Sequence, residues 1–268
     1  MTTLLQITWD ASPEILRIGS IALRWYGLFW ALSFYIGYEI MFRIFKKEGV
    51  PLQHVDKLLY VFAFGSIVGA RLGHCFFYDA SYYLQNPAEI IMIWKGGLAS
   101  HGGVIGILLA VWYYQQKISN KSFWWLIDRL VIPISLAAFF IRMGNLMNSE
   151  IYGVETSLPW GFIFAARGEL VPNHPTQLYE AIPYLLLFLS LGLLYIRKGA
   201  KLPTGFISGV FAFSMFSIRF LVEFVKEDQS AFEADMLLNM GQLLSIPLII
   251  TGIIRLIYSW PGKLPDKK

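Results

Sequence analysis

The sequence is poor in cysteine and in charged residues. Cys75 is its only cysteine, so the 268-residue chain can form neither an internal disulfide nor a metal site built from cysteines. Charged residues make up 15% of it, against roughly 25% in ordinary soluble domains. It also has no His-Glu-x-x-His motif and no Gly-Lys-Ser phosphate loop, which disfavours metal and nucleotide chemistry. We therefore expect no metal and no cofactor.

Long apolar runs dominate what is present. Hydrophobic residues form 56% of the chain, the mean hydropathy is +0.54, and the charges collect between the runs. This pattern is typical of a multi-pass membrane protein, in which about 20 residues cross the hydrocarbon core as a helix. We predict an all-α polytopic membrane protein with a single integral membrane domain over residues 1–268. Its seven spans are expected at about 19–42, 58–78, 97–114, 123–145, 178–196, 204–224 and 237–258.

The basic residues predict the orientation of these spans. A sequence pI of about 9.0 does not indicate nucleic-acid binding here, because the basic residues form no single patch. The loops on the two faces of the membrane differ in their number of basic residues. The less basic face carries only Arg17, Lys95, Arg167 and Lys226. The positive-inside rule therefore places the N-terminus outside and the C-terminus in the cytoplasm. The residues on the basic side are Arg43, Lys46, Lys47, Lys57, Lys117, Lys121, Arg197, Lys198, Lys201, Lys263, Lys267 and Lys268.

Two segments are expected outside the hydrocarbon core. Residues 1–18 lack the basic region, apolar core and cleavage site of a signal peptide, so we expect a short amphipathic approach to the membrane. Residues 148–177 form the only long extramembrane segment, which we interpret as a small outer cap. A short strand is expected there at about 160–165, and the cap carries Arg167 and His174.

Polar side chains interrupt several spans at one depth. Arg142, Asn145 and Ser149 have the i, i+3, i+7 spacing of one helical stripe. An arginine inside a membrane costs about 2.5–3.5 kcal/mol on insertion scales, so it needs a partner, water or a ligand. With the predicted topology, polar groups of the other spans fall in the same outer third, which indicates a polar cavity open to the outer leaflet. These groups are Tyr26, Arg71, His74, His101, Glu180, Arg219, Glu223 and Gln242.

Each group also has a purely structural alternative. The Arg142 stripe can serve only to lock helices together, and Arg71 can serve only to bond backbone carbonyls. Arg219 and Glu223 stand at i, i+4 and can simply neutralise each other. A single membrane cysteine such as Cys75 is usually a packing residue.

Glycines suggest two further features. Gly65, Gly69 and Gly73 form a small-residue stripe that predicts close helix packing. Four glycines surround His101, at positions 96, 97, 102 and 103. Because glycine has no side chain, we expect them to let another chain or a lipid headgroup approach the imidazole.

Five motifs follow one another along the chain. They are His101-Gly102-Gly103, Arg142-Met-Gly144-Asn145-x-x-Asn148-x-Glu150-x-x-Gly153, His174-Pro175-Thr-Gln177-Leu-Tyr179-Glu180-Ala181, Arg219-Phe-x-x-Glu223-Phe and Gly241-Gln242-x-x-Ser245-x-Pro247. Together they resemble the prolipoprotein diacylglyceryl transferase family, and the resemblance runs from Tyr26 to about Pro247. Two positions depart from it: Ser149 stands where the family usually has glycine, and Met215 where some members have tyrosine.

The resemblance implies an enzyme of the bacterial inner membrane. It would transfer the diacylglyceryl group of phosphatidylglycerol to the lipobox cysteine of a prolipoprotein, forming a thioether and releasing glycerol 1-phosphate. Its partners would be phosphatidylglycerol, the prolipoprotein signal peptide and membrane lipids, without nucleic acid. The catalytic residues would be Tyr26, His101, Arg142 and Arg219. The substrate-binding residues would be Arg71, Arg142, Asn145, Glu150, Gly153, Gln177, Glu223 and Gln242.

The roles within this set follow from the reaction. Arginine forks match the phosphate that leaves, so Arg142 and Arg219 are expected to clamp it. His101 is expected to act as the general base or to orient the phosphate, and the sequence leaves both roles open. The alternative function is a secondary transporter for an anionic substrate, which usually has inverted repeats and midplane sites. A seven-span receptor or scaffold is a further alternative, but it would need no ordered set of arginine, histidine and asparagine. An intramembrane hydrolase is a closer enzyme alternative, but no Ser/His pair or Asp pair is placed convincingly.

Overall fold

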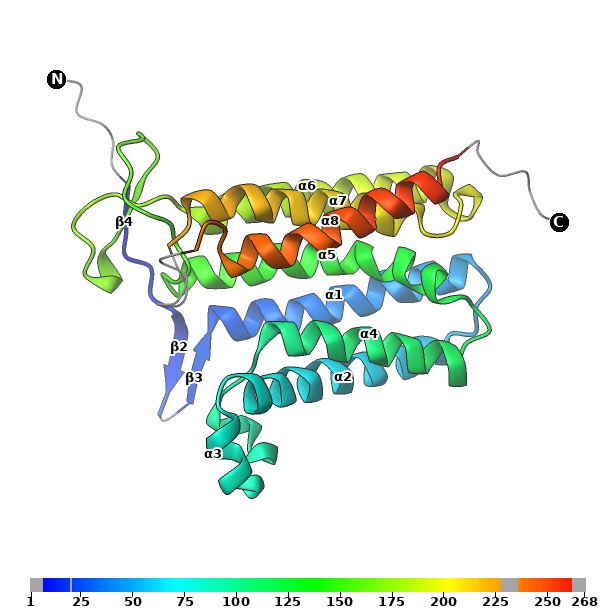
Figure 1. Ribbon diagram of the computed structural model, residues 1–268, viewed down its shortest axis with the longest axis horizontal. Coiled ribbons are helices and arrows are strands. Elements are labelled where there is room, and N and C mark those ends of the chain that lie inside the picture. The colour runs from blue at the N-terminus through cyan, green and yellow to red at the C-terminus, as the bar shows by residue number, and fades with distance from the viewer. Residues whose placement is uncertain (1–6, 20, 228–235, 262–268) are drawn as a thin grey trace. The chain divides into compact units, whose positions relative to one another are not determined.

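The computed structural model describes residues 7–19, 21–227 and 236–261 (Figure 1). It is mainly helical, as predicted, and six of its helices are long and apolar enough to cross a membrane. The third predicted span is a helix of 18 residues, α4 (Ser100–Lys117), which is not among the six. The six are α1 (Trp25–Lys47), α2 (Gln53–Phe77), α5 (Phe123–Met147), α6 (Thr176–Lys198), α7 (Phe206–Val222) with the 3-10 turn η5 (Glu223–Val225), and α8 (Met240–Tyr258).

The chain divides into two compact units. The first combines Met1–Ile40 with Asp128–Lys268, and the second is Met41–Ile127. The single membrane domain expected from the sequence stays a prediction. Three of the basic residues used to orient the chain, Lys263, Lys267 and Lys268, lie outside the described residues.

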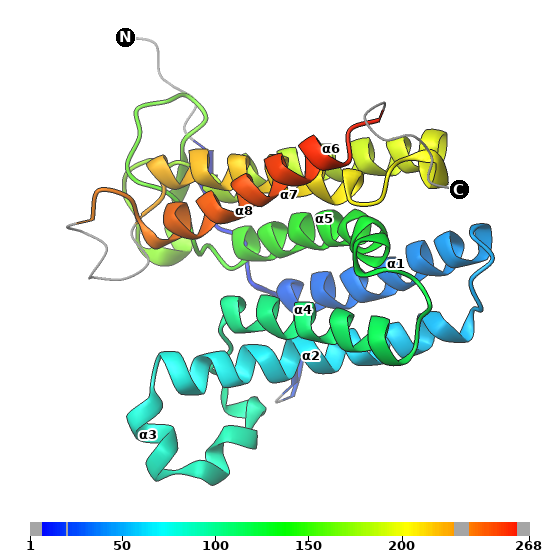
Figure 2. The ribbon, with the colours of Figure 1, turned by 45° about the vertical axis from the view of Figure 1, so that its right-hand side comes forward.

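Helix α7 is the central element of the first unit. It packs against both α6 and α8, and the three helices lie side by side in Figures 1 and 2. Gly252 of α8 allows a close approach, because a Cβ there would lie 2.5 Å from the backbone nitrogen of Phe213 in α7. At its N-terminal end, α7 is capped by a carboxylate from α5. Asp128 is 1% exposed and accepts hydrogen bonds from the backbone nitrogens of Gly205 (2.6 Å) and Ser208 (2.8 Å).

The outer cap packs on the C-terminal end of α5. Strand β4 (Phe162–Phe164) lies where a short strand was expected and pairs in parallel with β1 (Ile7–Trp9). Phe162, Phe164 and Leu146 form a buried cluster, and the Trp9 Nε1 donates to the Leu146 carbonyl at 3.0 Å. This apolar contact holds the segment that follows α5.

The expected boundaries of the first span were wrong at its start. Residues 19–24 were assigned to the helix, but β2 (Glu14–Ile18) and β3 (Ile21–Arg24) form an antiparallel hairpin, and α1 begins at Trp25. Gly19 has φ +60°, the left-handed conformation that such a turn favours. The prediction was wrong because the β-branched and aliphatic residues on both sides of the glycine are compatible with a strand as well as with the start of an apolar helix.

The second unit is built on close contact between α2 and α4, which lie side by side in both ribbon views. The small-residue stripe of α2 packs as predicted. A Cβ at Gly69 would lie 2.7 Å from the Cα of Gly106, and one at Gly73 would lie 2.7 Å from the Cα of Gly102. Between the helices, the chain forms α3 (Ala80–Gln85) and two 3-10 turns, η1 (Pro87–Ile91) and η2 (Ile93–Lys95).

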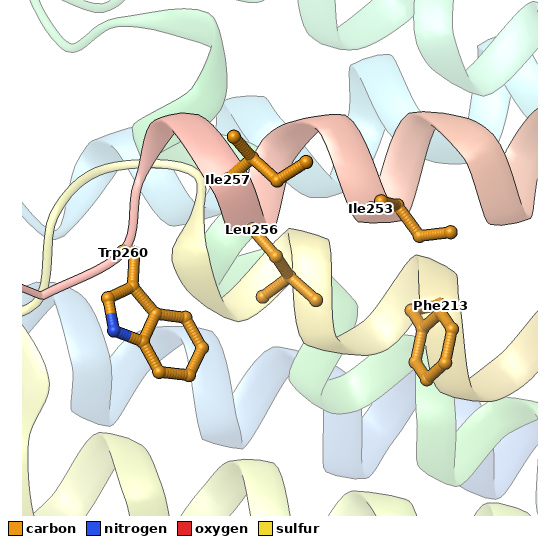
Figure 3. A pocket seen from close by; sticks show the side chains of 5 residues that line it. All are labelled: Phe213, Ile253, Leu256, Ile257 and Trp260. Carbon is orange, nitrogen blue, oxygen red and sulfur yellow. The ribbon is translucent and has the colours of Figure 1, made fainter.

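An apolar pocket of about 460 Å³ lies between α7 and α8, and Figure 3 shows its lining. No charged side chain lines it, so it can hold a hydrocarbon chain but has no group that would stabilise a charged transition state. It lies near the C-terminal end of α8, whereas Gln242 is in the first turn of that helix. The lining residues are Phe213, Ile253, Leu256, Ile257 and Trp260.

Candidate functional site

Arg142 lies in the last two turns of α5 and joins two helices. Its Nε forms an ion pair with Glu180 Oε2 of α6 at 2.5 Å, and its Nη1 donates to Asn145 Oδ1 at 3.0 Å. The Glu180 side chain is 1% exposed and that of Arg142 is 11% exposed. Tyr184, one turn along α6, donates its hydroxyl to the other oxygen of Glu180 at 3.3 Å. Two of the three guanidinium nitrogens are therefore engaged, and Nη2 has no partner among the described residues.

The polar chain continues from Arg142 into the cap. Asn145 donates to Glu150 Oε1 at 2.8 Å, and the Asn148 amide donates to the same oxygen at 3.2 Å. Gln177, which is fully buried, holds the backbone of this turn by donating to the Glu150 carbonyl at 2.8 Å. These contacts bring together Arg142, Asn145, Glu150 and Gln177, four of the residues predicted to bind substrate.

Gly153 is a packing position in the cap. A Cβ there would lie 2.7 Å from Thr176 and 2.8 Å from the Cβ of His174. Its backbone nitrogen donates to the His174 carbonyl at 2.8 Å. No larger residue fits without moving the backbone of the cap.

Ser149 does not continue the predicted helical stripe. Helix α5 ends at Met147, and Ser149 adopts φ +51°, followed by Ile151 at φ +59°. The sharp turn sends the chain into the cap, which is why the stripe ends at Asn145. Ser149 is 1% exposed, and its hydroxyl has no hydrogen-bond partner in the described part of the chain. The left-handed conformation gives a physical reason for a glycine at this position.

The second arginine, Arg219, belongs to a carboxylate centre at the end of α7. Its Nη2 lies 3.3 Å from Glu223 Oε1, so the expected i, i+4 pair is present. The same oxygen accepts a hydrogen bond from Lys226 Nζ at 3.0 Å. The Asn239 amide donates to the other carboxylate oxygen at 3.3 Å. Arg219 has a 31% exposed side chain, whereas Glu223 and Lys226 are buried.

The start of α8 makes room for Glu223. A Cβ at Gly241 would lie 2.9 Å from the Cγ of Glu223. Gln242 and Asn239 form a capping box, in which each side chain accepts from the other's backbone nitrogen. The Gln242 Nε2 is buried and has no partner among the described residues.

Tyr26 lies in the first turn of α1 and contacts α5. A Cβ added at Gly144 would lie 2.5 Å from its Cδ2, so the glycine is what allows the ring to approach the helix. Gly144 lies within one turn of Arg142 and Asn145 but on a different face of α5, so this contact places Tyr26 at the level of the polar stripe and not on its face. The tyrosine side chain is partly buried.

Arg71, in the second unit, binds backbone rather than presenting an open fork. It is 3% exposed and donates to the carbonyls of Glu89 (2.6 Å), Ile90 (2.8 Å) and Gly97 (3.1 Å), and also to that of Gly96. The structural alternative considered for it is therefore present. Arg71 fixes the segment 89–97 that leads to α4.

His101 is exposed in the first turn of α4. The expectation that its neighbouring glycines open space around the ring was wrong for Gly102, which faces α2. A Cβ there would lie 2.8 Å from the Cα of Gly73. Gly97 likewise contacts other side chains, because its Cβ would lie 2.5 Å from the Nε2 of His74. Cys75 is fully buried in α2.

Burial alters two titratable groups of the cap. It lowers the pKa of His174, whose Nδ1 lies 3.1 Å from the Tyr179 hydroxyl. Burial also raises the pKa of Tyr152 to about 12. Glu169 contributes to this rise, because its carboxylate accepts a hydrogen bond from the Tyr152 hydroxyl at 2.6 Å. Arg167 donates to the backbone carbonyls of Ser149 and Asn148 at 2.9 and 3.3 Å, which joins the cap to the end of α5.

The sequence did not assign roles to three residues of the polar network. Glu180 belongs to a quoted motif, but its pairing with Arg142 spans 38 positions and has no local signal. Lys226 was counted only as a scattered charge, although its spacing from Arg219 and Glu223, at i+7 and i+3, matches one helical face. Asn239 could have been found from the Asn-x-x-Gln capping pattern.

Comparison with known proteins adds an independent finding. The family model described as prolipoprotein diacylglyceryl transferase matches residues 13–258. A protein of Chloroherpeton thalassium is 47% identical over 259 residues, which cover 97% of this chain and 96% of that protein. One of Tolumonas auensis is 45% identical (94% and 96% covered), and one of Porphyromonas gingivalis is 46% identical (97% of each). All three bear the name phosphatidylglycerol–prolipoprotein diacylglyceryl transferase.

Proposed function

Because the chain belongs to the prolipoprotein diacylglyceryl transferase family, we propose how it moves a diacylglyceryl group from phosphatidylglycerol to a prolipoprotein. The chain is a multi-pass membrane enzyme whose activity is this transfer. The acceptor in our proposal is the thiol of the lipobox cysteine. The membrane is the bacterial inner membrane, with the N-terminus outside and the C-terminus in the cytoplasm, as the alternating basic loops indicate.

One observation carries the proposal: each of two arginines is held on one side by a buried carboxylate and keeps other donors unpaired. Arg142 is held by Glu180, and Arg219 by Glu223. Among the described residues, Nη2 of Arg142 and both Nε and Nη1 of Arg219 have no partner. A guanidinium fixed in this way binds a phosphate oxygen with little reorganisation. Arg142 and Arg219 are the proposed phosphate clamp.

The unpaired guanidinium donors suit an anionic lipid. Arg142, Arg219 and Lys226 supply three positive charges, and Glu150, Glu180 and Glu223 supply three negative ones, so the polar network as a whole is balanced. The attraction for a phosphodiester is therefore local to the two guanidinium groups, and apolar helices surround them, so it is weakly screened. The neutral amides of Asn145 and Gln242 are the proposed hydrogen-bonding groups for the glycerol headgroup.

The proposed reaction is a displacement at the glycerol C3 carbon. The cysteine thiol loses its proton, and the sulfur forms a bond to C3 as the C3–O bond breaks. The electron pair of that bond leaves with glycerol 1-phosphate, and the product is a thioether. The developing negative charge on the phosphate is what the clamp stabilises. Because the substrate supplies the nucleophile, no cysteine of the chain takes part.

His101 and Tyr26 complete the proposed catalytic set. The exposed imidazole of His101 is proposed either to accept the thiol proton or to orient the phosphate, and an unperturbed histidine pKa near 6.5 suits a base. Tyr26, beside Gly144, is proposed to donate a hydrogen bond near the reacting centre. Their support is the motif resemblance, and for Tyr26 also its contact with α5.

The remaining predicted binding residues act mainly through the backbone. Glu150 and Gln177 are proposed to hold the turn that presents Asn145, and Gly153 to let the cap strand lie close to it. Arg71 is proposed to act on substrate binding by fixing segment 89–97 through its carbonyl contacts.

The test is transfer by the purified chain in detergent, with phosphatidylglycerol and a peptide that contains a lipobox cysteine. Peptide mass and released glycerol phosphate are followed together, for wild type, Arg142→Ala and His101→Ala. We expect a diacylglyceryl mass gain with equimolar glycerol phosphate, lost in Arg142→Ala and strongly reduced in His101→Ala. Full activity of a folded Arg142→Ala variant would contradict the proposed phosphate clamp. No mass gain by folded wild type would favour a transporter for an anionic substrate.

A further inference from the structure

Lys226 is a buried cation to which the proposed mechanism gives no role. It follows η5 directly, is 6% exposed, and has a side chain that is only 3% exposed. A lysine is almost never fully buried unless it is paired. Its partner is Glu223, at 3.0 Å from Nζ.

The carboxylate of Glu223 is shared between two cations. Its Oε1 lies 3.0 Å from Lys226 Nζ and 3.3 Å from Arg219 Nη2. The lysine is the inner partner and the arginine the accessible one, with 3% and 31% of their side chains exposed. The shorter contact therefore goes to the cation that a ligand reaches less easily.

This sharing decides how much of Arg219 is free to bind an anion. With Lys226 present, the negative charge of Glu223 is balanced by a group that stays in the protein interior. Without the lysine, the negative charge of Glu223 would be balanced by Arg219 alone. The carboxylate would then compete with a phosphate for the same guanidinium. The lysine also lies within electrostatic range of Arg142 and Glu180, so one local charge balance includes both arginines.

The backbone of Lys226 is tied to the cap as well. It forms an isolated antiparallel bridge with Gly153, and the neighbouring Val154 nitrogen donates to the Val225 carbonyl at 3.1 Å. Lys226 thus connects the cap segment that follows Glu150 to the carboxylate that holds Arg219. A side chain at this position has little freedom to move away from Glu223.

We propose that Lys226 is a positioning residue of the transferase, which neutralises Glu223 so that Arg219 remains available to the phosphate of phosphatidylglycerol. The proposal rests on the proposed clamp. It predicts a specific kinetic effect: loss of the lysine charge weakens phosphatidylglycerol binding and leaves peptide binding unchanged.

The experiment measures kcat and KM for Lys226→Met, Lys226→Arg, Glu223→Gln and the Met/Gln double variant in detergent micelles. Phosphatidylglycerol and the lipobox peptide are varied separately. We expect Lys226→Met to raise the phosphatidylglycerol KM roughly tenfold, the loss expected for one charge-assisted interaction. The peptide KM should change less than about twofold, and Lys226→Arg should restore the phosphatidylglycerol KM to within about threefold of wild type.

The double variant separates positioning from general destabilisation. If Lys226 acts through Glu223, adding Lys226→Met to the Glu223→Gln variant should raise its phosphatidylglycerol KM by less than about twofold. Independent multiplication of the two effects, or an equal rise of both KM values, would overturn the proposal. Lys117→Met, an exposed lysine in the last turn of α4, is the matched control and should behave as wild type.

Arg219→Ala, measured in parallel, distinguishes this inference from the proposed clamp. Wild-type activity in Arg219→Ala would overturn the clamp and the inference together. Loss of activity there, with wild-type kinetics in Lys226→Met, would overturn the role of Lys226 alone. Should Lys226→Met fail to fold, Lys226→Arg decides: a phosphatidylglycerol KM within about threefold of wild type supports the role, and a larger rise overturns it.

Discussion

Arg142 and Glu180 form a buried ion pair, with Nε and Oε2 2.5 Å apart, that connects the end of α5 to the start of α6. The two residues are 38 positions apart in the sequence, and each is the closest charged partner of the other. Glu180 fixes Nε of the guanidinium and Asn145 accepts from Nη1, which leaves Nη2 to a ligand. The geometry of this pair sets the first prediction.

Glu180→Gln should impair transfer although the residue is not proposed to contact substrate. Removing one partner leaves a buried, uncompensated charge, which costs about 3–5 kcal/mol. We expect kcat/KM to fall by about 10–100-fold. Arg142→Lys should lose as much, because an ammonium cannot bond Glu180, Asn145 and a phosphate in one plane. Glu14→Gln breaks an exposed ion pair with Arg17 and is the matched control; a similar loss there would contradict the prediction.

Cys75→Ala should retain activity within about twofold of wild type, because the reacting thiol belongs to the peptide. The side chain is fully buried, so we expect a stability loss of about 1 kcal/mol from the lost packing. Transfer rate and thermal unfolding of the purified variant check both parts. A folded Cys75→Ala without activity would mean that the chain supplies a thiol of its own.

Ser149→Gly should stabilise the protein and keep it active. Glycine adopts φ +51° without strain, and the change also removes a buried hydroxyl that has no partner among the described residues. We expect about 0.5–1 kcal/mol, or a few degrees in Tm. Ser149→Ala removes the hydroxyl but keeps the Cβ, so it measures the hydroxyl alone. A Tm of Ser149→Gly below that of Ser149→Ala would contradict the conformational explanation.

Gly69→Ala should disrupt the packing of α2 against α4. The new Cβ would lie 2.7 Å from the Cα of Gly106, which is backbone and cannot turn aside. Overpacking of this kind costs about 1–3 kcal/mol. Gly192→Ala, in α6, is the control, because a Cβ there meets nothing within 4 Å. Thermal unfolding should show a clear loss for Gly69→Ala and none for Gly192→Ala; equal values would exclude the contact as a source of stability.

Acid should weaken the cap through His174. Burial lowers its pKa below that of the unfolded chain, so between about pH 6.5 and the lower folded value the unfolded chain binds more protons. Stability from this group is complete above about pH 6.5 and is lost as the pH falls. The drop in Tm between about pH 7.5 and 5.5 should be smaller for His174→Gln than for wild type. An unchanged drop would assign the acid sensitivity to other groups.

Local patterns predicted much of this protein. The length of the apolar runs predicted the helices, and the i, i+4 spacing predicted the pair of Arg219 and Glu223. The glycine stripe predicted that one face of α2 packs closely against another helix, which the structure identifies as α4. The hairpin before α1 was missed because aliphatic and β-branched residues suit a strand and a membrane helix alike. The partner of Arg142 was missed because a contact between α5 and α6 leaves no periodic trace. The turn at Ser149 was missed because serine at positive φ is set by the surrounding fold.

The carboxylate of Asp128 has an effect at a distance from its own hydrogen bonds. It fixes the first turn of α7, and Arg219 stands eleven residues beyond Ser208, roughly 16 Å along the helix axis. A helix anchored at its first turn cannot slide or rotate without breaking those bonds, so the height and direction of the arginine are set from the far end. Screens for inactive variants should therefore recover Asp128 together with the substrate-binding residues, although Asp128 is not among the residues proposed to bind substrate.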